Sequence, residues 1–420
     1  MKIRQHLDVA ISLSVKRPLF LHPFIIFSAV WLSVSFLYSL HLSSLLRYTT
    51  REAFTTALLI WAPFVAVLFI CGALHVVTTL GYSPAKPKWK LDCELLERRL
   101  RVWFKIWLAI SVIEIIVSGG IPLLWALQGS SKTYVDFGIP SLHGLVNSLL
   151  VAVALCQFFL FLVTKKRRHL VLPVFVLVWS VLVITRQLML SSLLEFCVVF
   201  LRLRPVRART IVAVPAVLLL FILLFGVIGD VRQGSSDAFR TLAQPTSAYP
   251  DWLPSGLLWG YIYITTPINN LMFTMQTVAP ANNVLFPNTS STLFPSVLRT
   301  MIYGSALGDA ESGQLVTDAF NVSTAYVGPY QDYGLLGMAL FSGLVAFMCY
   351  FLWIRSDIKH ILMYAVVAQC LILTLFFNLF FALPVIAQLI WLSYFFMPAI
   401  RFGVRMPDTL ITTPERARLS

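Results

Sequence analysis

Long apolar runs, separated by short polar connectors, dominate this chain. A helix needs about 20 residues to cross ~30 Å of hydrocarbon. Ten runs approach that length, at about 20–42, 54–78, 103–126, 142–164, 169–186, 188–202, 209–228, 334–354, 360–382 and 385–400. The fifth and sixth runs are short, and we expect them to form a tight hairpin near Arg186. The pattern predicts an all-α polytopic membrane protein with about ten transmembrane helices.

Composition supports this class and excludes a soluble one. Hydrophobic residues make up 58% of the 420 residues and charged residues 12%, whereas soluble domains are about half apolar and a quarter charged. The net charge of +14 does not indicate a nucleic-acid partner, because the basic residues lie in short groups between apolar runs.

Basic residues mark every second connector. Most of the 32 lysines and arginines lie within six segments, at 1–19, 79–106, 165–168, 202–209, 355–359 and 401–418. Cytoplasmic loops carry such an excess. We therefore expect an uncleaved first span, and we place both termini in the cytoplasm.

The long stretch between about Gly229 and Tyr333 is expected on the outer side. It holds seven acidic residues against three arginines. Its apolar run from Leu257 to Val278 could span, but a crossing would reverse every later basic connector. Gly260, Pro267 and the asparagines at 269–270 also interrupt a helical pattern, so we expect an external helix or a segment that dips into the membrane. The predicted domains are 1–228 (helices 1–7), 229–333 (outer loop), 334–400 (helices 8–10) and 401–420 (tail).

Two polar residues near the outer ends of spans are candidates for chemistry. Glu114 precedes Ser118-Gly119-Gly120-Ile121-Pro122, where broken backbone at membrane depth favours a cavity; the alternative is a buried structural partner. His143 begins the fourth span, either as a general base or as an ordinary helix-end residue. Neither the six cysteines nor the histidines show metal-ligand spacing, so we predict no metal and no cofactor.

Outer-face arginines and aromatic residues form a second set of candidates. Arg186 and Arg232 would suit a diphosphate, because guanidinium binds phosphate oxygens bidentately and stays charged; interfacial arginines that snorkel to water are the alternative. Seven of the fourteen tyrosines lie between Tyr249 and Tyr333. They would serve either as an interfacial belt or in sugar stacking.

With these residues identified, the chain resembles the O-antigen polymerase (Wzy, oligosaccharide repeat-unit polymerase) family. The resemblance rests on six blocks: Glu114–Leu124 (EIIVSGGIPLL), Tyr134–Ser148 (YVDFGIPSLHGLVNS), Thr185-Arg186-Gln187, Gly229-Asp230-Val231-Arg232, Tyr261–Leu271 (YIYITTPINNL) and Asn321–Gly334 (NVSTAYVGPYQDYG).

The resemblance implies a GT-C-like, metal-independent glycosyltransferase of the bacterial inner membrane with a periplasmic active site. Such enzymes transfer a growing glycan from undecaprenyl diphosphate to the terminal sugar of a new lipid-linked repeat unit. The implied partners are the two lipid-linked substrates and the bilayer, with a chain-length regulator as an optional partner and no nucleic acid.

By position, the resemblance assigns phosphate neutralisation to Arg186 and Arg232. The base stays open between His143, Glu114 and Asp332. The expected substrate-binding residues are Arg240, Arg299, Tyr261, Tyr263, Asn269, Asn270, Tyr326, Tyr330 and Gln331.

Two other functions fit the same pattern. O-antigen ligases carry a histidine in the large outer loop, and this loop has none. A polysaccharide flippase would show internal repeats and a site at the midplane, neither of which the sequence shows.

Overall fold

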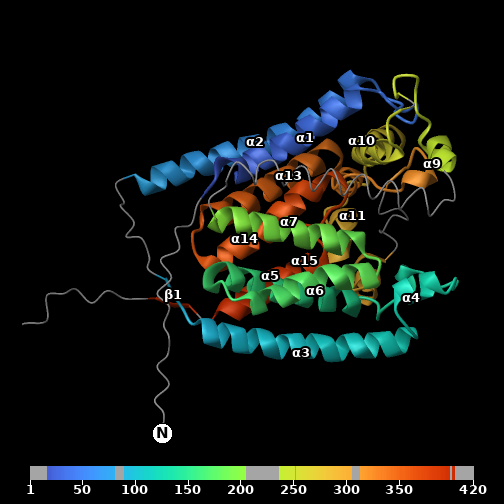
Figure 1. Cartoon of the computed structure of the whole chain (residues 1–420). Helices are drawn as coiled ribbons and strands as arrows, with labels where there is room; N and C mark the ends of the chain where they lie inside the picture. The colour runs from blue at the N-terminus through green and yellow to red at the C-terminus, as the bar shows by residue number, and fades with distance from the viewer. Residues whose placement is uncertain are drawn as a thin grey trace, which may run out of the picture.

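The computed structural model describes residues 17–80, 89–204, 236–250, 252–304, 313–397 and 400–402. Within these residues the chain is helical, apart from loops and one pair of three-residue strands. The helices are α1 (Pro23–Ser39), α2 (Thr50–Thr79), α3 (Cys93–Ser118), α4 (Pro122–Leu127), α5 (Leu142–Thr164), α6 (Val171–Leu182), α7 (Arg186–Leu203), α9 (Ser236–Ala243), α10 (Ser255–Thr277), α11 (Pro287–Ser290), α12 (Ser296–Tyr303), α13 (Val327–Ile354), α14 (Ile358–Ile372) and α15 (Leu383–Phe396). Most of the long helices run side by side along one direction (Figure 1).

Five of the described helices are long and apolar enough to cross a membrane. They are Thr50–Thr79, Cys93–Leu127, Leu142–Thr164, Val327–Ile354 and Ile358–Leu375. Two shorter apolar helices, α1 and α15, lie beside them. The predicted class of helical membrane protein is confirmed, while the count of ten spans stays a prediction. The run at 209–228 lies outside the described residues.

Two helices form the interior of the bundle. α5 and α14 are the most buried of the candidate spans, and α5 packs against α3, α6, α7 and α15. In lipid, helices associate through close packing and interhelical hydrogen bonds. Helices α2 and α13 show both. A Cβ added at Gly343 would lie only 3.2 Å from Val67, and the Ser342 hydroxyl donates to the Ile60 carbonyl at 3.0 Å.

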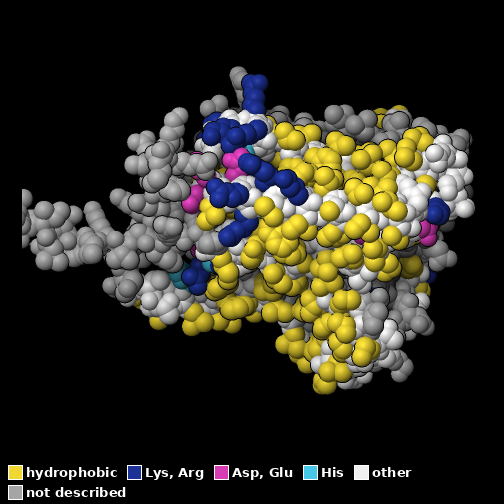
Figure 2. All heavy atoms as spheres, turned by 90° about the horizontal axis from the view of Figure 1, so that it is seen from below, with side chains coloured by type: hydrophobic (Ala, Val, Ile, Leu, Met, Phe, Trp, Pro, Cys, Tyr) yellow, Lys and Arg dark blue, Asp and Glu magenta, His cyan; other side chains and the backbone are white. Residues whose placement is uncertain are grey.

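The outer surface of the bundle is apolar, and its charge lies mainly at one end. Hydrophobic side chains cover much of the face in Figure 2, and lysines and arginines gather near one end of it. There Arg168 pairs with Glu97 at 2.7 Å, and Arg99 donates to the Tyr394 carbonyl at 3.0 Å. We call this the basic end. The described basic connectors thus share one end, as the charge pattern predicted.

A short strand pair closes the basic end. β1 (Trp89–Leu91) precedes α3, and β2 (Ile400–Phe402) follows α15. The two strands pair antiparallel, with Lys90 opposite Arg401. The connector before α3 is thereby joined to the chain beyond α15.

The opposite end, which we call the outer end, carries α9 to α12. Leu203 lies near the basic end, because Arg204 bonds the Leu162 carbonyl, whereas α9 lies at the outer end, where Ala243 accepts from Ser43 at 2.6 Å. The described residues on either side of the 209–228 run therefore lie at opposite ends of the bundle.

α10 crosses the outer end and is seen nearly end-on in Figure 1. Along its length it bonds the loop between α1 and α2: Tyr261 accepts from the Leu42 N–H at 2.9 Å, and Gln276 accepts from the Tyr48 hydroxyl at 3.1 Å. It is not among the described helices that are long and apolar enough to cross a membrane, and its place as an external helix or a segment that dips into the membrane stays a prediction.

The interruption of the helical pattern that Gly260, Pro267 and the two asparagines indicated is absent, and the segment forms a helix, which is one of the two expected alternatives. α10 is one helix from Ser255 to Thr277 with Pro267 inside it. The amides of Asn269 and Asn270 bond neighbouring loops, so they do not compete for the hydrogen bonds of their own helix.

Candidate functional site

Glu114 and His143, which lie 29 residues apart, meet at the outer end. The Nδ1 atom of His143 lies 3.1 Å from the Oε2 atom of Glu114. The second carboxylate oxygen accepts from the Ile139 N–H at 3.2 Å. Glu114 has no exposure, whereas 23% of the His143 side chain is exposed. The imidazole is therefore the accessible member of the pair.

The predicted break after Glu114 brings the loop onto this pair. α3 ends at Ser118 with Gly119 in a left-handed cap, at φ 74°, a conformation that glycine adopts without strain. Pro122 then begins α4. The Ser118 hydroxyl accepts from the Gly138 N–H at 2.9 Å. The backbone preceding His143 is thus fixed to the end of the helix that carries Glu114.

Two further residues determine which nitrogen of the imidazole carries the proton. The Trp179 indole N–H donates to the Asn147 Oδ1 at 3.1 Å. Since indole is only a donor, this bond turns the Asn147 Nδ2 towards the His143 Nε2, 2.9 Å away. Nε2 must therefore accept, and the ring proton sits on Nδ1, facing Glu114. The four side chains form one directed chain, Trp179–Asn147–His143–Glu114, which we call the histidine array.

Sequence reasoning missed Asn147 and Trp179. Asn147 lies one helical turn after His143 on α5, a spacing that could have drawn attention to it. Trp179 lies on α6, and nothing in the sequence links it to the array.

Arg186 lies at the same end as the histidine array. Three residues separate the end of α6 from Arg186, the first residue of α7, and α6 carries Trp179. Arg186 is exposed. This is the tight hairpin expected near Arg186.

The remaining arginines are placed only in part. Arg240 on α9 and Arg299 on α12 are half-buried, and both have interaction partners. Arg232 lies outside the described residues, so its predicted pairing with Arg186 stays a prediction.

Asp332, a candidate base, holds two helices together. Its buried carboxylate accepts four hydrogen bonds from α11, from the N–H and Nδ2 of Asn288 at 3.0 and 2.8 Å and from the N–H and hydroxyl of Thr289 at 2.8 and 2.6 Å. α13 bends just beyond it, at Tyr333 and Gly334. A carboxylate with this many donors has no lone pair left for a substrate proton. The geometry favours a structural role for Asp332.

The carboxylate of Asp136, close to His143 in the sequence, likewise accepts hydrogen bonds from neighbouring groups of the chain. Hydrogen bonds from the Thr133 N–H and hydroxyl hold the pKa of Asp136 below its usual value. The array thus has one carboxylate directly on the imidazole, that of Glu114.

Several predicted substrate-binding groups bond the protein itself. Asn269 accepts from the Tyr38 hydroxyl at 2.8 Å and donates to the Leu45 carbonyl at 3.0 Å. Asn270 donates to the Val322 carbonyl at 2.9 Å and accepts from the Val316 N–H at 3.0 Å. These amides tie α10 to the loops on either side of it.

The predicted tyrosines divide into buried and accessible ones. Tyr261 and Tyr326 are buried, with the Tyr326 hydroxyl 3.1 Å from Ser342, and the Tyr330 hydroxyl donates to the Met275 carbonyl at 2.9 Å. Tyr263 is 37% exposed and stacks on Trp259. Of this set, Tyr263 is the most accessible to a sugar.

Gln331 offers an open acceptor. Its side-chain oxygen is buried and finds no hydrogen-bond partner in the described part of the chain.

Within the described residues, His, Cys, Asp and Glu side chains form no group of three or more that could hold a metal ion. Independence from metal stays a prediction.

Comparison with known proteins gives no relative. No family model, no curated protein and no solved structure matches the chain. What the chain does must therefore be argued from the side chains of this helical membrane protein.

Proposed function

We propose that the protein polymerises lipid-linked oligosaccharide repeat units at the outer end of the bundle, on the periplasmic face of a bacterial inner membrane. In this reaction the growing glycan moves from undecaprenyl diphosphate to the terminal sugar of a new lipid-linked repeat. The observation that carries the proposal is the partly exposed imidazole of His143 held against the buried carboxylate of Glu114, at the same end as Arg186.

The array has the parts that sugar transfer requires. The acceptor hydroxyl oxygen forms a bond to the donor's anomeric carbon, and the bond from that carbon to the diphosphate oxygen breaks. The hydroxyl proton moves to Nε2 of His143, and the bonding electrons leave with the diphosphate. Glu114 stabilises the resulting imidazolium, as the carboxylate partner of a catalytic histidine does.

Asn147 sets a condition for this step. It occupies Nε2 in the structure, so the acceptor hydroxyl must displace its amide before the proton can move. Before the substrate binds, the array therefore fixes the orientation of the imidazole ring, with Nε2 facing Asn147.

The diphosphate is already a good leaving group, so positioning and neutralisation of charge are the main tasks. Arg186, exposed at the same end, would supply the second task without a metal. The lipid tails, confined to the bilayer, would bring the diphosphates to the depth of the helix ends.

The test uses purified protein with a synthetic undecaprenyl-diphosphate-linked repeat in the presence of a chelator. We expect a ladder of glycan lengths. Glu114→Gln and His143→Gln should each lower the rate of elongation by about 100-fold or more, since general acid–base catalysis contributes that much. His75→Gln on α2, near the basic end, is the matched control and should leave the ladder unchanged.

The outcomes separate the competing functions. Wild-type ladders from His143→Gln would remove the base from the mechanism, and no ladder from the wild-type protein would reject polymerisation. In cells that lack the protein, single repeats capped on the acceptor indicate a polymerase. Complete polymer on undecaprenyl lipid indicates a ligase, and repeats that face the cytoplasm indicate a flippase.

A further inference from the structure

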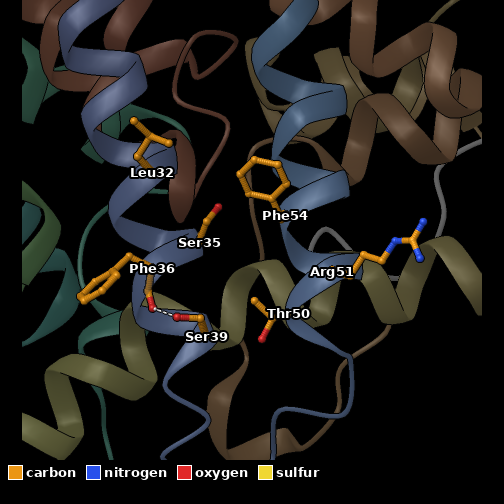
Figure 3. Close-up of a pocket in the computed structure, with 7 residues that line it drawn as sticks. All are labelled: Leu32, Ser35, Phe36, Ser39, Thr50, Arg51 and Phe54. Atoms are coloured by element: carbon orange, nitrogen blue, oxygen red, sulfur yellow. Dashed lines mark hydrogen bonds between the residues drawn. The ribbon is translucent and has the colours of Figure 1, made fainter.

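The groove between α1 and α2 shows how the chain covers the outside of the bundle. Leu32 and Phe36 line it and are 60% and 66% exposed. The Ser39 side chain beside them donates its hydroxyl hydrogen to the Phe36 carbonyl of its own helix (Figure 3). Such a hydroxyl carries no charge and needs no partner from another helix. An ionisable side chain inside the bundle is different, because it is costly there unless its charge is neutralised.

Glu195 is an ionisable side chain of this kind. It lies midway along α7 and is 1% exposed. Its Oε2 atom accepts a hydrogen bond from the Nε2 of Gln388 on α15 at 2.7 Å. An ionised carboxylate offers about four acceptor sites, and among the described residues this amide is the one hydrogen-bond donor that reaches it. An ionised Glu195 would therefore be stabilised far less than Asp332, which has four donors.

No basic side chain in the described part of the chain compensates a charge on Glu195. Its surroundings are apolar apart from the Gln388 amide, and the Cys370 thiol of α14 is its titratable neighbour. Arg202 lies on the same buried face of α7, but seven residues separate the two, which is about 10 Å of helix rise. The Arg202 guanidinium packs instead on the Trp353 ring, at 4.5 Å from its centre.

The other titratable side chains of the helices packed around α7 form no ion pair or hydrogen bond with Glu195. α6 has none, and those of α5, α14 and α15 are His143, Cys156, Lys359, His360, Tyr364 and Tyr394.

A second polar pair lies one helical turn closer to the outer end. The Gln369 Nε2 on α14 donates to the Ser191 hydroxyl at 2.9 Å. Ser191 precedes Glu195 by four residues and is half-buried. On the other side of Glu195, the buried face of α7 continues with Val198 and Val199. The polar groups next to Glu195 thus lead towards the outer end.

We propose that Glu195 is a proton-binding site inside the bundle, where its carboxyl group holds a proton between α7 and α15. A buried carboxylate without a cation is costly among apolar helices, and a bound proton removes the charge. Because Gln388 donates to Oε2, the proton resides on Oε1. A proton fits better than a metal ion, since the described residues place no group of three His, Cys, Asp or Glu side chains together. The site is independent of the proposed sugar transfer.

The first test labels the purified full-length protein in detergent with dicyclohexylcarbodiimide, an apolar reagent that reacts with protonated carboxyl groups. Peptide mass spectrometry should find the adduct at Glu195 in mildly acidic buffer and about tenfold less of it in strongly alkaline buffer, where the proton is lost. Asp332, held by four donors, is the internal control and should stay unlabelled in both. Gln388→Met should preserve the label to higher pH, because the lost amide donor favours the ionised form.

The second test follows the melting temperature with pH. A folded state that holds a proton which the unfolded chain releases loses stability as the pH rises, because the unfolded state then binds fewer protons. The wild type should therefore lose more of its melting temperature with rising pH than Glu195→Gln, whose amide imitates the neutral carboxyl group. Glu94→Gln, at an exposed position of α3, is the matched control and should follow the wild type.

Three results would overturn the proposal. The first is the absence of an adduct at Glu195 in acidic buffer, or an equal amount of it in alkaline buffer. The second is the same pH dependence of the melting temperature in the wild type and Glu195→Gln. The third is protection of Glu195 from the carbodiimide by sodium ions at constant pH, because the site would then hold a metal cation and not a proton.

Discussion

A fully buried carboxylate near the end of a membrane-spanning helix requires hydrogen-bond partners within the protein. Glu114 has two, the imidazole of His143 and the Ile139 N–H. Asp332 is equally buried but has four donors around it. The number and kind of donors thus distinguish a carboxylate that orients an imidazole from one that fastens a helix. This distinction depends on contacts that no local sequence pattern contains.

Trp179→Phe should change the tautomer of His143. Phenylalanine keeps the aromatic volume but removes the indole donor that orients Asn147. Asn147 could then turn its oxygen towards Nε2, and we expect a population of His143 with the proton on that atom. Imidazole nitrogen chemical shifts measured by NMR would report it, with His143→Gln used to assign the signal among the seven histidines.

Trp107→Phe is the control for this variant. The indole nitrogen of Trp107 is buried without a hydrogen-bond partner among the described residues, and its ring lies 5.2 Å from that of Trp179. The substitution alters the same aromatic cluster without removing a hydrogen bond. Identical spectra from the two variants would contradict the proposed role of Trp179.

At the scale of elements, two segments at the outer end are fixed by partners distant in the sequence. The turn at Gly138 lies against the imidazole, and the short helix α11 is held to α13 by Asp332. Both depend on contacts between segments distant in the sequence. The sequence could therefore predict the spans that flank these loops, but not which loop side chains meet.

Gly138→Ala should disrupt the histidine array. Gly138 has φ 88°, and a Cβ there would lie 2.7 Å from the Cγ of His143. We expect a lower melting temperature and loss of ladder formation. Gly129→Ala is the matched control, because Gly129 has φ 66° but nothing within 4 Å of its missing Cβ. Equal loss in both variants would attribute the effect to backbone strain and not to the imidazole.

Asp332→Asn should destabilise the protein without removing the base. The new amide would place a donor among the donors of Asn288 and Thr289. This would lower the free energy of unfolding by an amount on the order of 2 kcal/mol. We expect a lower melting temperature in detergent, with an unchanged elongation rate per folded molecule. Asp136→Asn, in an exposed turn, serves as the comparison. Loss of the ladder at an unchanged melting temperature would restore Asp332 as a candidate base.

At the scale of the whole molecule, the two ends differ in charge, and the sequence predicted this difference well. Every backbone polar group in lipid must be satisfied within its own helix, so long apolar runs identify spans with little help from tertiary contacts. The pattern was less informative for α10, which continues through Pro267 although glycine, proline and asparagine interrupt the helical pattern there. It did not reveal the histidine array either, where Trp179 and Asn147 meet only through packing.

Cysteine labelling should show that the basic end faces the cytoplasm. In a background with the partly exposed Cys71, Cys93 and Cys197 replaced by serine, Ser130→Cys should react with a membrane-impermeant maleimide in spheroplasts. Lys166→Cys should react only after permeabilisation, because positive charge is retained on the cytoplasmic side. The reverse pattern would place the histidine array in the cytoplasm and reject a periplasmic reaction.

The strand pair at the basic end has a bearing on a residue at the far end of α3. About 21 residues separate Cys93 from Glu114, which corresponds to roughly 32 Å of rigid helix. α3 contacts the bundle mainly through α5 and α15, and β1 tethers its base to the strand that follows α15. Truncation of the chain before Ile400 would remove this strand pairing. A small tilt of α3 about its N-terminal end would then move the Glu114 carboxylate away from the His143 imidazole. The strand that follows α15 would therefore influence the alignment of Glu114 with His143 at the opposite end of the bundle.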